Sequence, residues 1–146
     1  MDHKTKEMDV EYMKFVRIGT IYSPYKEKSD APRQGVYSKE VMILEIDEQY
    51  QLGLTDIEKH DHLVVLYWGD RSDRNTLLAK PPGQDTVTGV FSTRSPNRPN
   101  QIAMCTVKVL NVEDNRIHVV GLDALDQSPI LDIKPYVPLL DEVGME

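Results

Sequence analysis

The chain contains 146 residues, of which 40% are apolar and 28% are charged, and its net charge is -7 at pH 7. This length fits one domain and excludes two catalytic domains. The composition and the mean hydropathy of -0.45 indicate a folded domain with a polar surface and exclude a disordered chain. The longest apolar run, residues 63–68, is far shorter than the roughly 20 residues of a membrane-spanning helix.

The first residues of the chain and its single cysteine indicate in which cellular compartment the protein folds. Residues 1–14 are charged and polar and lack the apolar stretch of a signal peptide. Cys105 has no other cysteine to pair with, so no disulfide forms within the chain. We therefore expect a cytoplasmic protein with a polar stub over 1–14, one domain over 15–140 and a tail over 141–146.

Three strands are predicted in the first half of the chain. Residues 15–22 are rich in β-branched and aromatic residues and end at a Ser-Pro pair, a pattern typical of a strand. Residues 40–46 and 62–68 predict the next two strands, with a short helical excursion over 47–58 between them. The loop over 25–37 is long, and structureless loops of this size are usually functional or disordered.

The second half repeats this alternation of strands and turns. Further strands are predicted over residues 87–92, 102–112 and 116–122. Asp114 and Asn115 form the predicted hairpin turn between the last two. Pro129, Pro135 and Pro138 exclude a regular helix through those points of the tail. Six or so strands with little helix predict a mainly β fold, an antiparallel sheet curled into a barrel.

Basic residues are concentrated between positions 71 and 98. Arg71, Arg74, Lys80, Arg94 and Arg98 stand there against two acidic residues, a local charge of +3 that leaves -10 on the rest of the chain. A basic band on an acidic body can bind a nucleic acid selectively. Charge alone equally fits a solvated loop whose arginines pair with nearby carboxylates.

Two histidines raise a metal hypothesis. His60 and His62 stand two residues apart, and residues two apart on a strand share a face. No cysteine cluster accompanies them, and a loop leading into a strand is the favoured interpretation, so we predict no metal site. Cys105 lies among alternating apolar residues and is expected to be a small buried hydrophobe.

Three polar stretches combine rigid backbone with hydrogen-bonding groups. They are Pro32-Arg33-Gln34, residues 94–98 and residues 126–129. That combination can hold a polar ligand at a low ordering cost, although each stretch taken alone also fits a surface turn. No glycine-rich phosphate loop follows a predicted strand, so a nucleotide cofactor would need a different binding device.

Two long motifs resemble the signature of the TrmO/TsaA-like family. They are residues 89–100, GVFSTRSPNRPN, and residues 121–136, GLDALDQSPILDIKPY. Residues 18–25 and 32–34 match the opening of the family pattern. The resemblance implies a single-sheeted β-barrel that binds S-adenosylmethionine near a homodimer interface. The activity that it implies is methylation of tRNA at the exocyclic amine of threonylcarbamoyladenosine, 3′ of the anticodon, with no membrane or DNA partner.

The resemblance also carries binding residues over, position by position. The implied cofactor contacts are Pro32, Arg33, Gln34, Asp70, Arg71, Arg94, Met104, Asp126, Gln127, Ser128 and Pro129. Most of them fall in the three polar stretches. The chain departs from the family pattern at residues 101–105, QIAMC, and at Gly69 and Asp70, where an aromatic residue and a histidine are usual.

Methyl transfer from a sulfonium requires alignment of the reactants more than covalent catalysis. A carboxylate beside the acceptor amine could take its proton, and Asp126 is our first candidate, with Tyr136 as a weaker polar alternative. Asp126 equally fits a cofactor-binding role. Arg94 and Arg98 carry planar guanidinium groups that suit the carboxylate of the substrate or an anticodon phosphate.

A second class of function stays open. The chain could be a non-catalytic module that binds S-adenosylmethionine or RNA without modifying it. Its acidic balance favours this alternative. So does the expectation that it lacks the C-terminal domain by which longer family members are implied to bind tRNA.

Overall fold

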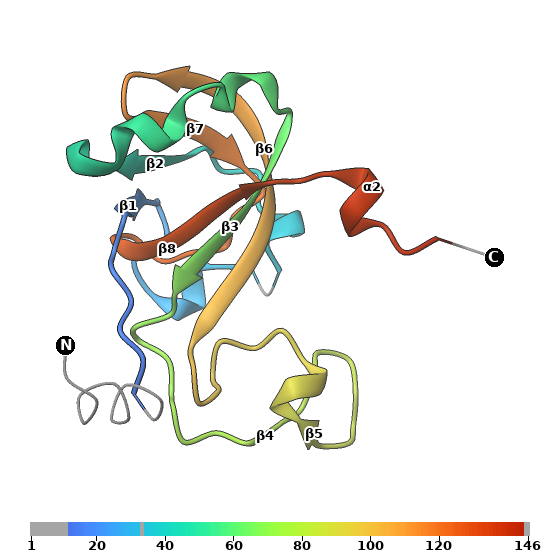
Figure 1. Ribbon diagram of the computed structural model, residues 1–146. Helices are drawn as coiled ribbons and strands as arrows, with labels where there is room; N and C mark the ends of the chain where they lie inside the picture. Colours follow the sequence, from blue (N-terminus) through green and yellow to red (C-terminus); the bar gives the residue numbers. More distant parts are fainter. Residues whose placement is uncertain (1–11, 33, 145–146) are drawn as a thin grey trace, which may run out of the picture.

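The fold is a closed barrel of six strands, seen in the computed structural model of residues 12–32 and 34–144 (Figure 1). Around the barrel the strands follow the order β1-β2-β7-β6-β3-β8, and all neighbouring pairs are antiparallel. The strands are β1 (Gly19–Tyr22), β2 (Met42–Ile46), β3 (His62–Trp68), β6 (Ile102–Glu113), β7 (Arg116–Val120) and β8 (Ser128–Pro135). The predicted mainly β barrel is confirmed.

Alternating apolar residues explain how these segments enclose a core. In β3 the side chains of Leu63, Val65 and Tyr67 are buried and those between them are more exposed. The first half of β6 alternates in the same way, and Cys105 is one of its buried residues. Successive side chains of a strand point to opposite faces, so one face of each strand fills the barrel. Because side chains fill the interior, a ligand site has to lie outside the barrel.

The connections that carry the predicted polar stretches lie at one end of the barrel, because neighbouring strands alternate in direction. The β1–β2 connection contains the 3₁₀ helices η1 (Lys28–Asp30) and η2 (Gly35–Tyr37). Residues 69–101, here called the arm, join β3 to β6 and project beyond the barrel in Figure 1. The arm contains a two-stranded sheet of β4 (Leu78–Ala79) and β5 (Thr88–Gly89). Residues 121–127 join β7 to β8 at the same end.

Two predicted strands are much shorter than expected. The first begins at Gly19, where pairing with β2 and β8 starts, and not at residue 15. The strand predicted over 87–92 is wrong for most of its length: only β5 is extended, and the 3₁₀ helix η5 (Val90–Ser92) follows it. β5 pairs only with the two-residue β4, so its apolar, β-branched composition finds no longer partner to extend along.

The tail contains a barrel strand that the sequence analysis missed. β8 pairs with both β1 and β3, and Pro129 and Pro135 lie near its two ends. Proline removes a backbone donor, which is tolerated most readily at strand ends. Pro138 stands at the first position of the short helix α2 (Pro138–Asp141), where its missing N–H costs no hydrogen bond. The prediction that no regular helix runs through these prolines is confirmed.

The predicted helical excursion is confirmed as two 3₁₀ helices, η3 (Glu48–Leu54) and η4 (Ile57–Lys59). The predicted hairpin turn is also present, with Asp114 at a φ of 53° between β6 and β7. Within the described parts of the chain, no helix has the length and apolar character needed to cross a membrane.

Candidate functional site

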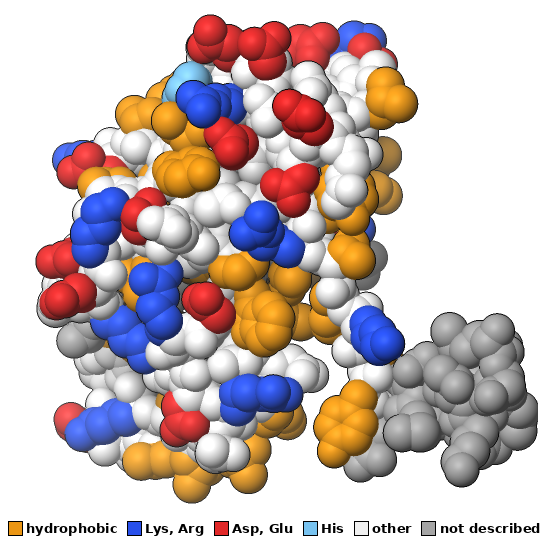
Figure 2. Space-filling view, turned by 90° about the vertical axis from the view of Figure 1, so that its left-hand side faces the viewer, with side chains coloured by type: hydrophobic (Ala, Val, Ile, Leu, Met, Phe, Trp, Pro, Cys, Tyr) orange, Lys and Arg blue, Asp and Glu red, His pale blue; other side chains and the backbone are white. Residues whose placement is uncertain are grey.

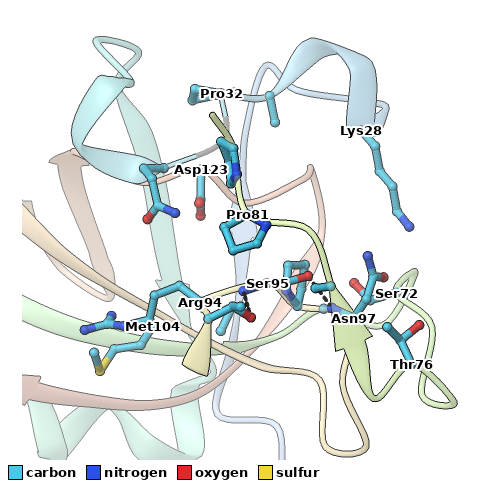
Figure 3. A pocket seen from close by; sticks show the side chains of 18 of the residues that line it. Lys28, Pro32, Ser72, Thr76, Pro81, Arg94, Ser95, Asn97, Met104 and Asp123 are labelled. Carbon is cyan, nitrogen blue, oxygen red and sulfur yellow. Dashed lines mark hydrogen bonds between the residues drawn. The ribbon is translucent and has the colours of Figure 1, made fainter. Parts of the chain in front are cut away.

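A cavity of about 1200 Å³ lies between the open end of the barrel and the arm. Its walls come from four separate parts of the chain. Pro32 belongs to the β1–β2 connection, Arg94 to the arm, Met104 to β6 and Asp123 to the β7–β8 connection. Figure 3 shows these side chains on different segments of the chain around the cavity. The cavity exceeds the roughly 300–1,000 Å³ of typical small-ligand pockets, so it has room for more than one reactant.

Most of the expected cofactor contacts lie at this cavity. The lining includes Pro32, Gln34, Asp70, Arg71, Arg94, Met104 and Ser128. Asp126 and Gln127 line a smaller hollow of about 470 Å³, which shares Asp70 and Arg71 with the cavity and therefore adjoins it. Pro129 follows Ser128 in β8, where it pairs with Thr20. Arg33 lies outside the described residues.

Asp126 anchors the turn before β8 to the chain after β1. Its Oδ1 accepts a hydrogen bond of 2.9 Å from the Ser23 N–H, and its Oδ2 accepts one of 2.7 Å from Lys26 Nζ. The bond from Lys26 and then that from Ser23 hold the pKa of the Asp126 carboxyl below its usual range. Both oxygens of this carboxylate are thus already engaged. Asp126 is better placed to shape the site than to accept a proton from a substrate.

Arg71 connects the arm to the same turn. Its guanidinium donates to the backbone oxygen of Asp126 at 2.8 Å and to Ser128 Oγ at 3.3 Å. Its Nε lies 3.6 Å from an Asp70 carboxylate oxygen. Gln127, between these contacts, has a φ of 66°, and its N–H bonds to the Ile21 oxygen at 2.7 Å. The turn is therefore fixed from both sides, which lowers the ordering cost of a ligand bound against it.

Arg98 braces the arm and does not line the cavity. Its guanidinium donates to the backbone oxygens of Thr93 and Ser95, both at 2.9 Å. Asn97 Oδ1 accepts the Asp73 N–H at 2.9 Å and so ties the two halves of the arm together. These contacts fix the loop that presents Arg94 to the cavity. The expectation that Arg98 itself meets the substrate gains no support from this geometry.

Gln101, a departure from the family pattern, closes the base of the arm. Its side chain donates to the Ser72 oxygen at 2.9 Å and accepts from Trp68 Nε1 at 3.3 Å. Its backbone oxygen accepts the Gly69 N–H at 2.8 Å. Trp68 is 42% exposed at this edge. The chain around Asp70 is therefore held in place although its sequence is atypical.

Tyr136 does not join this cluster. It follows the far end of β8, where its N–H bonds to the His62 oxygen and its ring meets the His62 ring edge to face. His62 begins β3 and Tyr67 lies near the end that faces the cavity, so most of the strand separates Tyr136 from the cavity, about 17 Å at roughly 3.3 Å per residue. Its hydroxyl donates to Glu142 at 3.3 Å.

Asp123 is a cavity residue that the sequence analysis did not single out. Its Oδ1 accepts hydrogen bonds from the Tyr67 hydroxyl at 2.5 Å and from Cys105 Sγ at 3.1 Å. Burial, reinforced by the charge of Asp123, raises the pKa of both Tyr67 and Cys105, so both remain protonated donors. Cys105 is buried as expected, but its thiol also serves a polar contact. Only the position of Asp123 in the 121–136 motif could have pointed to it.

The basic band is only partly free to meet a ligand. Besides Arg71 and Arg98, Arg74 donates to a backbone oxygen, that of Pro99 at 3.3 Å. Lys80 and Arg94 line the cavity. Figure 2 shows a group of acidic side chains along the upper edge of one face, with basic and acidic side chains interspersed below it. In the described part of the chain, no cluster of three or more His, Cys, Asp or Glu side chains could hold a metal ion.

Known proteins are similar to this chain in sequence and in fold. An S-adenosyl-L-methionine-binding protein from Archaeoglobus fulgidus is 50% identical over 127 residues, 87% of this chain and 91% of the relative. A crystal structure of TrmO superposes with a TM-score of 0.73 at 33% identity, over 90% of this chain and 58% of that one. TrmO from Pseudomonas aeruginosa gives a TM-score of 0.71 at 31% identity with the same coverage.

The chain thus spans just over half the length of the solved TrmO chains that it matches. The family model described as the tRNA-methyltransferase O N-terminal domain matches residues 20–142. This range includes every residue that lines the cavity and the whole barrel except the first residue of β1. This protein therefore belongs to the tRNA-methyltransferase O N-terminal domain family.

Proposed function

We propose that the protein is an S-adenosylmethionine-dependent tRNA methyltransferase that acts on the exocyclic amine of threonylcarbamoyladenosine, 3′ of the anticodon. The observation that carries this proposal is that Gln34, Arg94 and Ser128 line one cavity although they are far apart in the chain. Gln34 and Arg94 are 60 positions apart, and Arg94 and Ser128 are 34 positions apart. Membership of the family supplies the reaction type.

The residues around the cavity fit the proposed cofactor chemically. Pro32, Met104 and Leu125 offer apolar surface for an adenine ring, and the side chains of Gln34 and Ser128 offer hydrogen bonds for ribose and amino-acid groups. Asp70 supplies a negative charge for an ammonium or a sulfonium. When bound, S-adenosylmethionine supplies an electrophilic methyl group. The chain itself has to bind and orient both reactants so that the reacting atoms approach to about 3–3.5 Å.

Arg94 is the residue best placed to bind an anionic part of the substrate. It is exposed, it lines the cavity, and Figure 3 shows its side chain extending in the same direction as that of Met104. A guanidinium can hold a carboxylate with two parallel hydrogen bonds. The threonyl carboxylate of the proposed substrate is such a group, so Arg94 would orient the amine that is methylated.

A homodimer with the cofactor near its interface is part of the proposal. Trp68, Ile102 and Met104 expose apolar surface beside the cavity, at 42%, 37% and 43%. Exposed apolar patches next to a ligand site are common where a partner covers the site. Gel filtration with light scattering measures the state directly: twice the chain mass of 16.7 kDa is expected.

The test of the function is an incubation with methyl-labelled S-adenosylmethionine and tRNA from cells that lack this protein. Label located in the anticodon loop, at the threonylcarbamoyl nucleotide, is the expected result. The Arg94→Ala variant, which should retain the fold, is expected to transfer the label at least 10-fold more slowly at limiting tRNA. Label elsewhere in the tRNA would assign a different substrate.

The alternative is a module that binds S-adenosylmethionine without transferring its methyl group. The name of the relative from Archaeoglobus fulgidus, an S-adenosyl-L-methionine-binding protein, favours it. The same incubation separates the two functions. Cofactor binding measured by calorimetry, with no label in tRNA, would support the module.

A further inference from the structure

Asp123 presents one fixed carboxylate oxygen to the protein and the other to the cavity. Tyr67 and Cys105 both donate to Oδ1, at 2.5 and 3.1 Å. Among residues 12–32 and 34–144, no hydrogen bond reaches Oδ2, whereas Asp123 lines the cavity, where Figure 3 shows its side chain. Two donors on one oxygen fix the orientation of a carboxylate and leave the other oxygen as an acceptor for a ligand.

The other carboxylates near the cavity are less suited to receive a proton. Asp126 already accepts from Ser23 and Lys26. Asp70 has a side chain that is 45% exposed and lies 3.6 Å from Arg71 Nε. An exposed side chain keeps its rotamer freedom and its contact with water, whereas Asp123 is half-buried and held by two buried donors.

Tyr67 and Cys105 cannot accept a proton from a substrate, which leaves Asp123 as the acceptor in this cluster. Burial keeps both the Tyr67 hydroxyl and the Cys105 thiol protonated, so neither competes as a base or as a nucleophile. The buried cluster thus has one group that can accept a proton, and that group faces the cavity.

We propose that Asp123 Oδ2 is the general base that removes the amine proton during methyl transfer, an inference that rests on the proposed function. A bond forms between the methyl carbon and the acceptor nitrogen, and the bond between that carbon and the donor sulfur breaks. The sulfur keeps the electron pair and becomes a neutral thioether. The proton of the nitrogen moves to Oδ2, so Asp123 ends the step as a neutral carboxylic acid.

The first test compares Asp123→Asn with Asp114→Asn, the same change at the β6–β7 hairpin outside the cavity. In single turnover at saturating cofactor and tRNA, Asp123→Asn is expected to slow methyl transfer by at least about 100-fold, the usual range for loss of a general base. Asp114→Asn is expected to match the wild type. Calorimetry with S-adenosylhomocysteine, which needs no turnover, is expected to give affinities within about 3-fold for all three proteins.

Three results would overturn the inference. Transfer by Asp123→Asn within 3-fold of the wild type would remove the base role. An equal loss of S-adenosylhomocysteine affinity and of rate would make Asp123 a cofactor ligand. A wild-type protein that binds S-adenosylhomocysteine but methylates no tRNA would refute the proposed function, and the inference with it, so the two failures are distinguishable.

A second variant guards against misfolding of the first. Asp123→Ala opens a space beside Tyr67 and Cys105 in which formate can stand for the missing carboxylate. Added formate is expected to raise the transfer rate of this variant at least 10-fold and to leave the wild-type rate unchanged. A folded, cofactor-binding Asp123→Ala protein that formate does not activate would contradict the inference.

Discussion

Arg94 and Arg98 stand four residues apart in the arm, yet their guanidinium groups have different surroundings. Arg98 is half-buried and bonds to two backbone oxygens of its own loop, whereas Arg94 is exposed and lines the cavity. From the sequence alone, both arginines are expected to bind an anionic group of the substrate. The structure assigns one to the scaffold and leaves the other for a ligand.

We therefore expect Arg98→Ala to lower the free energy of unfolding by about 1.5–3 kcal/mol, the usual contribution of hydrogen bonds to a charged group. Arg94→Ala, the matched control in the same loop, is expected to change it by less than about 0.5 kcal/mol. Urea denaturation followed by circular dichroism measures both. Equal stability of the two variants would show that the Arg98 contacts do not hold the arm.

The stability contributed by Asp126 should depend on pH. Its pKa is lowered by Lys26 and Ser23, so its contribution is present above the ordinary Asp value near 3.9 and is lost as the pH falls through the lowered folded value. At pH 7, Asp126→Asn is expected to be about 1–3 kcal/mol less stable than the wild type.

This difference in the free energy of unfolding is expected to shrink when the measurements are repeated in acid. The protonated carboxyl group of the wild type and the amide of Asp126→Asn are then both neutral. The matched comparison is Lys26→Ala, which removes an exposed partner and is expected to cost less than about 1 kcal/mol at pH 7. A gap between Asp126→Asn and the wild type that is constant with pH would refute the linkage.

At the scale of elements, the 3₁₀ helix η2 packs so tightly that it tolerates no side chain at Gly35. A Cβ added there would lie 2.4 Å from the Gly121 oxygen and 2.9 Å from Cys105 Sγ. Backbone cannot yield as a flexible side chain does. Gly35 follows Gln34 directly, so its close packing also sets where that cavity residue lies.

Gly35→Ala is accordingly expected to lower the free energy of unfolding by about 1–3 kcal/mol, the cost of overpacking. Gly53→Ala is the matched control, because a Cβ there meets nothing within 4 Å. It is expected to be neutral or to stabilise by up to about 1 kcal/mol. Thermal unfolding in parallel measures both, and a neutral Gly35→Ala would refute the close contact.

At the scale of the whole molecule, the charge of -7 limits how the protein holds a polyanion. Lys26 beside the cavity is already paired with Asp126, so the lysines and arginine that remain available to line it are Lys28, Lys80 and Arg94. Figure 2 shows basic and acidic side chains interspersed on one face. Binding to tRNA should therefore depend on a few local contacts and not on a broad basic surface.

About three phosphate contacts predict a slope near -2.5 for the logarithm of the tRNA binding constant against the logarithm of the salt concentration. Fluorescence anisotropy titrations over a range of KCl concentrations measure this slope. Lys80→Ala is expected to make it shallower by about 1. A slope steeper than about -6 would indicate a larger basic surface than this chain presents.

The barrel was predictable because its strands carry their own pattern. An unbroken apolar run identifies β3, and alternating apolar residues identify β6 and β7, which the Asp114 turn joins as a hairpin. β8 was missed because its prolines hide the pattern, although they lie near strand ends where pairing tolerates them. β5 was overextended because β propensity acts only where a partner strand lies alongside.

The sequence by itself determined the fold class, the family resemblance and the polar stretches that could bind a ligand, because each is written in neighbouring residues. Tertiary structure decided which polar groups are engaged and which face the cavity. Asp126 and Arg98 have suitable side chains, but Asp126 is bonded to the backbone and to Lys26, and Arg98 is bonded to the backbone. Asp123 is held in position by Tyr67 and Cys105, which lie 56 and 18 positions away in the chain. Hydrogen-bond partners brought together by strand pairing leave no local trace in the sequence, which is why only the folded chain shows them.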